Sequence, residues 1–301
     1  MNLKTTLAFL VFLLIVACKN SEEKGAPAER IQPQMANSEG FVPESWIKGR
    51  VAKAKQRLEA SEAGKVVWQA MEAHGGLANW YANGPFTFHF NYRPLDGGTP
   101  RDTYQAVDTW SSRARHFQAG DSTAQYGWDG TKAWVAVQDS TVFPYNTRFW
   151  SLTPYFFAAQ PFVLDGKGVN LELLPQKEHL GKTQDVVKVT FDAGTGDAPD
   201  DYYVLYFDAM SHNLSVIRYI VSYPGYFKKG EHLPEKLMQL EGAQVVDGIW
   251  FPKQYSTHWL NEDESTGEHI TSITLSEIAF QPGLGEAFFK IPDKATILEG
   301  L

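Results

Sequence analysis

The eight histidines are the side chains of this chain best suited to metal binding or proton transfer, and they are scattered along it. No two have the His-Glu-x-x-His spacing, which presents two imidazoles to zinc from one helix face. His74 precedes Gly75-Gly76 at the expected end of a helix, where a protonated imidazole would meet free backbone carbonyls. We interpret His89 and His258, which lie on expected strands, as residues of the solvent-facing side or as hydrogen-bonded core residues. The pattern predicts no metal site, no cofactor and no catalytic histidine. The histidines are His74, His89, His116, His179, His212, His232, His258 and His269.

Nucleophile and carboxylate motifs are equally sparse. Gly120-Asp121-Ser122 lacks the second glycine of a Gly-x-Ser-x-Gly elbow. The densest acidic group surrounds Gly194 and Gly196, but its spacing does not match a calcium-binding EF-hand loop, so we interpret it as a solvated hairpin. Carboxylate pairs that hydrolyse glycosides are assembled in space rather than in sequence, so an envelope hydrolase acting on glycans or lipids stays open as an alternative. The acidic group is Asp192, Asp197, Asp200 and Asp201.

Cys18, the single cysteine of the chain, directly follows the apolar run Leu7–Ala17, and Lys4 precedes that run. The run is too short to span a bilayer as a helix and suits the apolar region of an export signal. It ends in Ile15-Val16-Ala17-Cys18, which resembles the lipobox of bacterial lipoproteins. In such a site the cysteine thiol carries acyl chains such as palmitate. The sequence therefore predicts a signal peptide over residues 1–17 and a lipidated Cys18.

Residues 18–40 are rich in Ser, Glu, Lys, Ala, Pro and Gln and poor in large apolar side chains. Such a segment cannot bury enough apolar surface to fold, so we expect a flexible tether. Its Glu22-Glu23 pair resembles the acidic export signal of surface lipoproteins in some bacteria, although such pairs are also common in polar linkers. We expect a lipid anchor in the outer membrane, with the folded part on the periplasmic rather than the cell-surface side.

The charge balance limits the kinds of partner. The chain has 35 acidic and 27 basic residues and a net charge of -8. Nucleic acids and anionic lipid surfaces attract clustered Lys and Arg, so we expect no nucleic-acid partner and membrane contact through the anchor. With Cys18 lipidated, no thiol is left for a disulfide, and stability must come from core packing. We expect a monomer.

Apolar spacing predicts helices at the start of the folded part. Residues 44–62 carry apolar side chains at spacings of four, three and four, which place them on one helix face. A second helical stretch over residues 66–80 is interrupted by Gly75-Gly76 and ends at Gly84-Pro85. The apolar positions of the first helix are Ile47, Val51, Ala54 and Leu58.

After Pro85 the apolar period changes to two, which predicts strands with one apolar face. Asp129-Gly130 and Asp247-Gly248 each predict a hairpin turn. Aromatic residues make up 14% of the chain, with nine Trp, as suits broad sheet faces or a ring-lined pocket. The expected strands are 86–92, 103–110, 113–118, 124–128, 133–138, 169–174, 186–191, 202–207, 214–223, 236–246, 249–259 and 269–280.

One ring-rich stretch, Asn146–Gln160, interrupts the strands with helical character. A long meander with few helices predicts a mainly β fold with α (α+β), in which helices lie on the concave side of one large sheet. We expect a single domain over residues 41–301. Its architecture is a curled antiparallel sheet of about eleven strands, a half-open β-barrel lidded by helices.

The aromatic side chains predict where a ligand would bind. Four of them alternate along the first strand and share one sheet face, and three in the helical stretch should close over that face. A cavity between the two sets would take a hydrophobic ligand. A fully packed sheet without a ligand is the alternative. The expected cavity residues are Phe86, Phe88, Phe90 and Tyr92 on the strand, and Trp150, Tyr155 and Phe157 on the helical stretch.

The order of these elements resembles the LolA and LolB superfamily of lipoprotein carriers and receptors. The residues that carry the resemblance are the hairpin QYGWDGTKAWV, the segment VDGIWFP and the terminal FFKIPD, at 125–135, 246–252 and 288–293. The resemblance implies a half-open barrel whose apolar cavity holds the acyl chains of a lipoprotein. It also implies an arginine that holds the lid, for which Arg93, Arg101 and Arg148 are the candidates.

These inferences favour a membrane-anchored envelope lipoprotein that binds a lipid, a lipoprotein acyl chain or another hydrophobic ligand and is not an enzyme. Two alternatives stay open. One is an envelope hydrolase, and the other is a structural or interaction lipoprotein with no ligand.

Overall fold

Two antiparallel meanders build the sheet in residues 42–299, the part of the chain that this computed structural model describes. The first meander starts at an alternating strand in which Phe86, Phe88 and Phe90 are buried and the residues between them are half-buried. The predicted strand and its apolar face are therefore confirmed. The strands of this meander are β1 (Phe86–Pro94), β2 (Arg101–Val107), β3 (Ala114–Gln118), β4 (Asp121–Trp128) and β5 (Ala133–Ala136).

The second meander supplies the other half of the sheet. Its strands are β6 (Val169–His179), β7 (Lys182–Phe191), β8 (Tyr203–Asp208), β9 (Leu214–Tyr219), β10 (Lys236–Glu241), β13 (Gln254–Leu260) and β14 (Thr266–Phe280). Two regions expected as single strands are each divided. Gly242, with φ +67°, turns the chain between β10 and β11 (Gln244–Val246), and Pro252-Lys253 separates β12 (Ile249–Phe251) from β13. Proline cannot donate a ladder hydrogen bond, which accounts for the second break.

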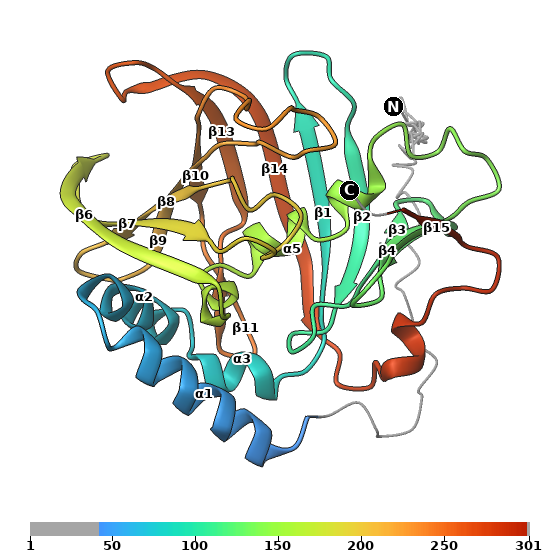
Figure 1. The fold of residues 1–301 in the computed structure, drawn as a ribbon, viewed down its shortest axis with the longest axis horizontal. Helices are drawn as coiled ribbons and strands as arrows, with labels where there is room; N and C mark the ends of the chain where they lie inside the picture. The colour runs from blue at the N-terminus through green and yellow to red at the C-terminus, as the bar shows by residue number, and fades with distance from the viewer. Residues whose placement is uncertain (1–41, 300–301) are drawn as a thin grey trace, which may run out of the picture. The chain divides into compact units, whose positions relative to one another are not determined.

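The meanders join along the pair β1–β14, giving one sheet of thirteen strands rather than about eleven (Figure 1). The order is β15-β5-β4-β3-β2-β1-β14-β13-β10-β9-β8-β7-β6, and β15 is Thr296–Leu298. All its neighbouring strands are antiparallel. The outermost strands, β15 and β6, do not pair with each other, so the curled sheet stays open as the half-barrel architecture requires.

Three helices precede the sheet: α1 (Glu44–Leu58), α2 (Glu62–Ala73) and α3 (Leu77–Ala82). Helix α2 begins at Ser61, whose hydroxyl accepts a hydrogen bond from the Gly64 N–H (3.0 Å), and packs against β6 and β7. Its C-terminal end meets the hairpin β11–β12. Gly75 has φ +113°, and a Cβ there would lie 2.1 Å from the Gly248 carbonyl oxygen, so only glycine allows this contact.

The hairpin β11–β12 confirms the turn predicted at Asp247-Gly248. Both residues have positive φ, 48° and 79°, as a two-residue type I′ turn requires. The hairpin is held on α3, because the side-chain amides of Asn79 and Asn83 both donate to the Asp247 carbonyl (3.1 and 3.0 Å). The turn predicted at Asp129-Gly130 also joins two strands, β4 and β5, within a four-residue loop, residues 129–132.

The segment between the meanders carries α4 (Thr147–Trp150), α5 (Thr153–Ala158) and the 3₁₀ helix η1 (Phe162–Asp165). The single helical stretch expected at 146–160 is thus two short helices. Pro154, at the start of α5, has no N–H to continue α4. Since β6 is one edge strand and β5 lies next to the other edge strand, β15, the segment has to cross the sheet, and it does so on the inner face. Figure 1 shows α5 in the bend between β9 and β14.

The sequence did not predict β15 or the 3₁₀ helix η2 (Glu286–Phe289) that precedes it. Strand β15 has three residues, two of them exposed, and so lacks an alternating apolar pattern. The predicted signal peptide, Cys18 and the whole predicted tether lie outside residues 42–299. No helix within those residues is long and apolar enough to cross a membrane.

Candidate ligand-binding cavity

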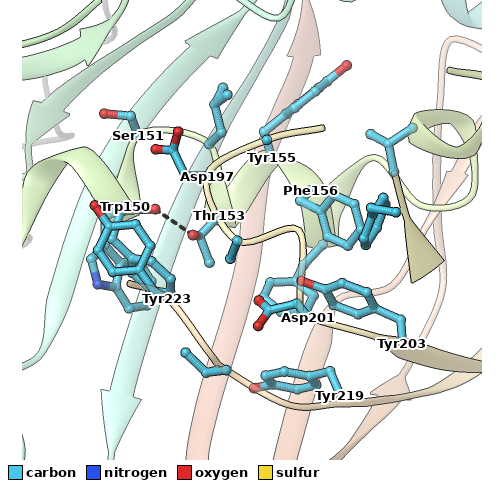
Figure 2. Close-up of a pocket in the computed structure, with 18 of the residues that line it drawn as sticks. Trp150, Ser151, Thr153, Tyr155, Phe156, Asp197, Asp201, Tyr203, Tyr219 and Tyr223 are labelled. Atoms are coloured by element: carbon cyan, nitrogen blue, oxygen red, sulfur yellow. Dashed lines mark hydrogen bonds between the residues drawn. The ribbon is translucent and has the colours of Figure 1, made fainter. Parts of the chain in front are cut away.

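A cavity of about 600 Å³ lies between the inner face of the sheet and the α4–α5 segment (Figure 2). Both meanders contribute to its wall, through strands β1, β2, β4, β6 to β10 and β14. Four exposed lining residues, Lys167, Gly196, Asp197 and Tyr226, mark its opening to solvent. The volume falls within the range of small-molecule pockets, about 300–1,000 Å³.

Five of the seven expected cavity residues line this space. Phe90 and Tyr92 reach it from β1, and Trp150, Tyr155 and Phe157 reach it from α4 and α5. The Tyr92 and Trp150 rings meet edge to face with centroids 5.0 Å apart. The structure therefore brings the strand and the helical segment together around one space.

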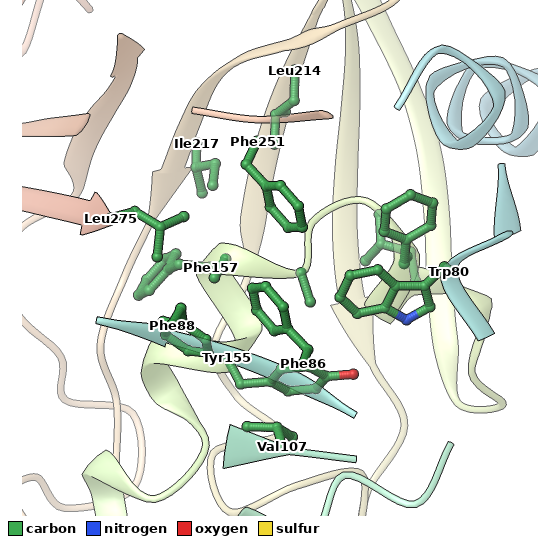
Figure 3. Close-up of a cluster of buried hydrophobic side chains, with 14 of the residues drawn as sticks. Trp80, Phe86, Phe88, Val107, Tyr155, Phe157, Leu214, Ile217, Phe251 and Leu275 are labelled. Atoms are coloured by element: carbon green, nitrogen blue, oxygen red, sulfur yellow. The ribbon is translucent and has the colours of Figure 1, made fainter. Parts of the chain in front are cut away.

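Phe86 and Phe88 do not line the cavity, and this part of the expectation is corrected. Both are fully buried, and their rings stack on each other with centroids 4.6 Å apart. Figure 3 shows them in the hydrophobic core with Trp80 and Phe251. The Phe86 ring is parallel to that of Phe251 at 5.2 Å. The four aromatic residues of β1 do point to one face, but the α3 tryptophan and the β12 ring fill the space near Phe86.

The second meander supplies another part of the aromatic wall. Tyr203 and Tyr219 are cross-strand partners on β8 and β9 and stack with centroids 6.1 Å apart. Phe156 of α5 packs on Tyr203 at 4.7 Å, and Phe157 packs on Tyr219 at 5.2 Å. Figure 2 shows the rings of Phe156, Tyr203 and Tyr219 around the cavity. Sequence reasoning did not assign the two tyrosines to the cavity, because strand order, and not strand pattern, places β8 and β9 opposite α5.

Buried hydrogen bonds fix the helical segment on the first meander. The Asn146 side chain caps α4 by accepting from the Phe149 N–H (3.1 Å). His116, which is fully buried on β3, donates from Nε2 to the Ser151 carbonyl (2.8 Å) and stacks on Tyr126. Burial lowers the pKa of His116 to about 3, so this imidazole is neutral at physiological pH.

A second set of contacts, the Asp165 cluster, ties the end of the same segment to the N-terminal helices. The Asp165 carboxylate accepts two hydrogen bonds from Arg50 of α1 (2.6 and 2.8 Å) and one from the Tyr81 hydroxyl (2.5 Å). Arg57 donates to the backbone carbonyls of Asp165 and Leu164 (2.6 and 3.0 Å). The segment that roofs the cavity is therefore held at both ends by polar contacts.

The acidic loop between β7 and β8 lies at the cavity rather than in solvent alone. Asp197 forms an ion pair with Arg148 of α4 (2.9 Å). Asp201 is buried, and its carboxylate accepts from the N–H and hydroxyl of Ser222 (2.6 and 2.7 Å). Burial raises the pKa of Asp201. Asp192 and Asp200 are exposed. The solvated-hairpin interpretation therefore fits Asp192 and Asp200, whereas Asp197 is exposed but ion-paired and Asp201 is buried.

Two further cations face the cavity. The Arg101 guanidinium on β2 lies among the rings of Trp150, Tyr92 and Tyr145, with its carbon 4.4, 4.9 and 5.2 Å from their centroids. Lys236 starts β10, where its ammonium lies 5.2 Å from the Trp259 ring centroid. Of the three arginines named as lid-holding candidates, Arg101 contacts α4 from the sheet, Arg148 belongs to α4, and Arg93 is exposed on β1.

His74 occupies the helix end as expected, but it is not protonated there. It is almost fully buried, and its Nε2 accepts a hydrogen bond from the Leu214 N–H (3.1 Å). Burial lowers its pKa to about 3. The backbone carbonyl of His74, and not its ring, receives the Trp250 N–H (2.8 Å).

The outer face of the sheet brings together a serine, a histidine and an aspartate that no sequence motif connects. His89 of β1 contacts Asp102 of β2 through Nε2 (2.5 Å) and Ser276 of β14 through Nδ1 (3.3 Å). His89 points away from the face that carries Phe88 and Phe90, so this group lies outside the cavity. Among residues 42–299, no three His, Cys, Asp or Glu side chains are grouped so as to hold a metal ion.

Comparisons with solved structures find several similar proteins at low sequence identity. A LolA superfamily protein from Nitrosomonas europaea is similar over 77% of this chain and 96% of its own, with 11% identity and a TM-score of 0.45. An outer membrane lipoprotein-sorting protein domain from Vibrio parahaemolyticus covers 76% and 97%, with 13% identity and a TM-score of 0.45.

A DUF1329 family protein from Desulfovibrio piger is similar over 81% of this chain and 97% of its own, with 13% identity and a TM-score of 0.45. No protein-family model matches the sequence, and no curated protein matches it either. Similarity at these sequence identities and TM-scores does not assign a function to this chain. The function has to be inferred from the cavity itself.

Proposed function

We propose that this chain is a lipoprotein of the bacterial envelope, anchored through Cys18, that binds a hydrophobic ligand in the cavity. The ligand class is a lipid, an acyl chain of another lipoprotein or a similar apolar molecule. The observation that carries the proposal is an open cavity of about 600 Å³ walled by aromatic side chains from both meanders and from α4–α5. A purely structural sheet would fill this space with side chains, since protein interiors are close-packed.

The rest of the proposal follows from the sequence. The signal peptide over residues 1–17, the tether over 18–40 and the single domain over 41–301 stay predictions. The outer-membrane anchor, the periplasmic location of the folded part and the monomeric state also stay predictions. We propose a binding protein rather than an enzyme, because the cavity wall is mainly aromatic and aliphatic. Its polar groups include the Arg148–Asp197 pair and the Asp201–Ser222 pair, which satisfy one another.

Paired substitutions of two phenylalanines test the cavity. Phe156 is half-buried and lines the cavity, whereas Phe88 lies in the core. Phe88→Ala should lose about 3–5 kcal/mol of unfolding free energy and keep its affinity for a neutral fluorescent dye. Phe156→Ala should lose less stability and bind the dye more weakly. The two measurements are urea unfolding and dye titration on the mature chain carrying Cys18→Ser. If the parent protein does not bind the dye, the result favours the alternative of a structural lipoprotein without a ligand.

A second candidate function rests on Ser276, His89 and Asp102, whose contacts resemble those of a hydrolase nucleophile, base and orienting acid. An envelope hydrolase using them would turn over ester or glycan substrates and would lose that turnover in Ser276→Ala. We expect no turnover by the parent, because these residues lie outside the cavity. Turnover on envelope fractions that vanishes in Ser276→Ala would favour the hydrolase.

A further inference from the structure

Arg101 and Lys236 are two cations of the cavity wall that no carboxylate neutralises. Both line the cavity, from β2 and β10. Within residues 42–299, no carboxylate oxygen lies within 4.0 Å of a side-chain nitrogen of either residue, so neither forms an ion pair. Partly buried cations are normally paired, because burial without a counter-charge is unfavourable.

Aromatic rings surround the Arg101 guanidinium, and only part of its hydrogen-bonding capacity is used. Three aromatic rings surround it at 4.4–5.2 Å, which fixes its plane. One of its terminal nitrogens donates to the Thr99 carbonyl. Its Nε is buried and has no hydrogen-bond partner within residues 42–299. An unpaired buried donor is costly, and a guanidinium presents its donors in a fork that matches a carboxylate or phosphate.

Lys236 lines the same cavity as Arg101 and is also only partly exposed. Burial lowers the pKa of Lys236, and Arg101 lowers it further, whereas Asp96 acts in the opposite direction without reaching ion-pair distance. On the sheet, Lys236 pairs across strands with Tyr219, one of the cavity rings. An anion between the two cations would relieve their repulsion and favour the charged lysine.

The other charges inside the cavity are already paired, and Lys167, which forms no ion pair within residues 42–299, lies exposed at the opening. Arg148 is neutralised by Asp197, and the Asp201 carboxylate is satisfied by Ser222. The uncompensated positive charge therefore concentrates at Arg101 and Lys236, in a chain whose net charge is -8. Arg101 also contacts the rings of Tyr92 and Trp150, so the cationic position adjoins the apolar wall.

We propose that Arg101 and Lys236 bind the acidic headgroup of an amphiphilic ligand, a carboxylate or a phosphate, while its apolar tail lies along the aromatic wall. This inference rests on the proposed function and narrows the ligand from any hydrophobic molecule to an acidic amphiphile. Charge-assisted hydrogen bonds to Arg101 and Lys236 would give the acidic compound its advantage over a neutral one of the same length.

The test compares three ligands with the same sixteen-carbon chain and different headgroups: palmitate, hexadecyl phosphate and hexadecanol. Each displaces a neutral naphthalene dye from the mature chain carrying Cys18→Ser. We expect the acidic ligands to bind roughly tenfold or more tightly than the alcohol. The ratio between palmitate and hexadecyl phosphate distinguishes a fatty-acid headgroup from a phospholipid-type headgroup.

Matched variants assign the preference to the two cations. Arg101→Gln and Lys236→Met should each reduce the acid-to-alcohol ratio severalfold with little change in affinity for hexadecanol. Arg93→Gln, an exposed arginine of β1, and Lys188→Met, whose ammonium lies 5.2 Å from the Tyr202 ring outside the cavity, should keep the ratio. If Arg101→Gln does not fold, Lys236→Met and Arg101→Lys are compared instead. Arg101→Lys keeps the positive charge but loses the forked arrangement of guanidinium donors.

The outcomes separate this inference from the proposed function. Equal binding of acid and alcohol by the parent, or an acid preference that survives in both cation variants, overturns the headgroup site and leaves hydrophobic binding intact. Failure of all three ligands and of the dye to bind the parent overturns the proposed function itself.

Discussion

The guanidinium carbon of Arg101 lies 4.4 Å from the centroid of the Trp150 ring. This contact links β2 of the sheet to α4 of the segment that crosses it. Trp150 also meets Tyr92 of β1 edge to face, so one indole holds the segment against two neighbouring strands and forms part of the cavity wall. The position of the roof and the shape of the cavity are therefore coupled through Trp150.

Replacing Trp150 should affect ligand binding more than a core substitution of similar size does. Trp150→Leu removes the cation–π contact, worth about 0.5–2 kcal/mol, and the edge-to-face contact with Tyr92. We expect weaker dye binding and a modest loss of stability, whereas Trp150→Phe, which keeps a ring, should recover most of the affinity. Dye titration and urea unfolding of both variants measure the two effects. Unchanged dye affinity in Trp150→Leu would show that this ring is not part of the binding wall.

The Asp165 cluster should be a major source of stability outside the apolar core. Asp165→Asn removes the charge that accepts two hydrogen bonds from Arg50. We expect a loss of about 2–3 kcal/mol, below that of a fully buried ion pair because the Arg50 side chain is 36% exposed.

The matched control for Asp165 is Asp139→Asn, because Asp139 is an exposed loop residue whose carboxylate accepts hydrogen bonds from Thr141 alone within residues 42–299. It should cost less than about 0.5 kcal/mol. Urea unfolding compares the two, and equal costs would mean that the cluster does not hold the roof segment to the helices.

Stability should fall as the pH drops below about 6.5, before most carboxylates titrate. His74 and His116 have pKa values lowered from 6.5 to about 3 by burial. Between these values the unfolded chain binds protons that the folded chain does not, so the free energy of unfolding decreases toward acid. Each histidine contributes a slope of up to about 1.4 kcal/mol per pH unit.

Replacing one of these histidines tests the assignment. His116→Gln keeps a donor for the Ser151 carbonyl and removes one titrating group. Unfolding free energies measured from pH 4.5 to 7 should give a shallower slope for this variant. A slope identical to that of the parent would mean that His116 is protonated in the folded state.

The anchor is tested by the lipidation site. Acyl chains contribute about 0.8 kcal/mol per buried CH₂, so a multiply acylated Cys18 should hold the protein firmly in the membrane. Cys18→Ser should therefore move the protein to the soluble fraction after a salt wash. Retention of the serine variant in the membrane fraction would point to another means of attachment.

The sequence predicted local structure better than it predicted the cavity. The alternation of Phe86, Phe88 and Phe90 identified β1 and its buried face, because side chains on a strand alternate regardless of what lies beyond. It did not show that Phe86 and Phe88 pack in the core while Phe90 reaches the cavity. That division depends on where Trp80 and Phe251 lie, and the place of Phe251, from a distant part of the chain, follows from the tertiary fold.

Lys236 shows the same limit for the candidate site. In the sequence it only begins a strand, and its spacing carries no motif. Its place in the cavity follows from the register that sets it beside Tyr219 on one strand and Trp259 on the other. The short, mostly exposed β15 was not predicted because its three residues have no apolar pattern to detect.

Native mass spectrometry of the mature chain carrying Cys18→Ser, after incubation with a lipid extract of its own host envelope, tests the central claim most directly. The account predicts a discrete added mass that tandem dissociation identifies as an amphiphile, and less of it bound to Phe156→Ala than to Phe88→Ala or the parent. A protein that keeps its bare mass across the lipid concentration range would contradict the claim that this cavity binds a hydrophobic ligand.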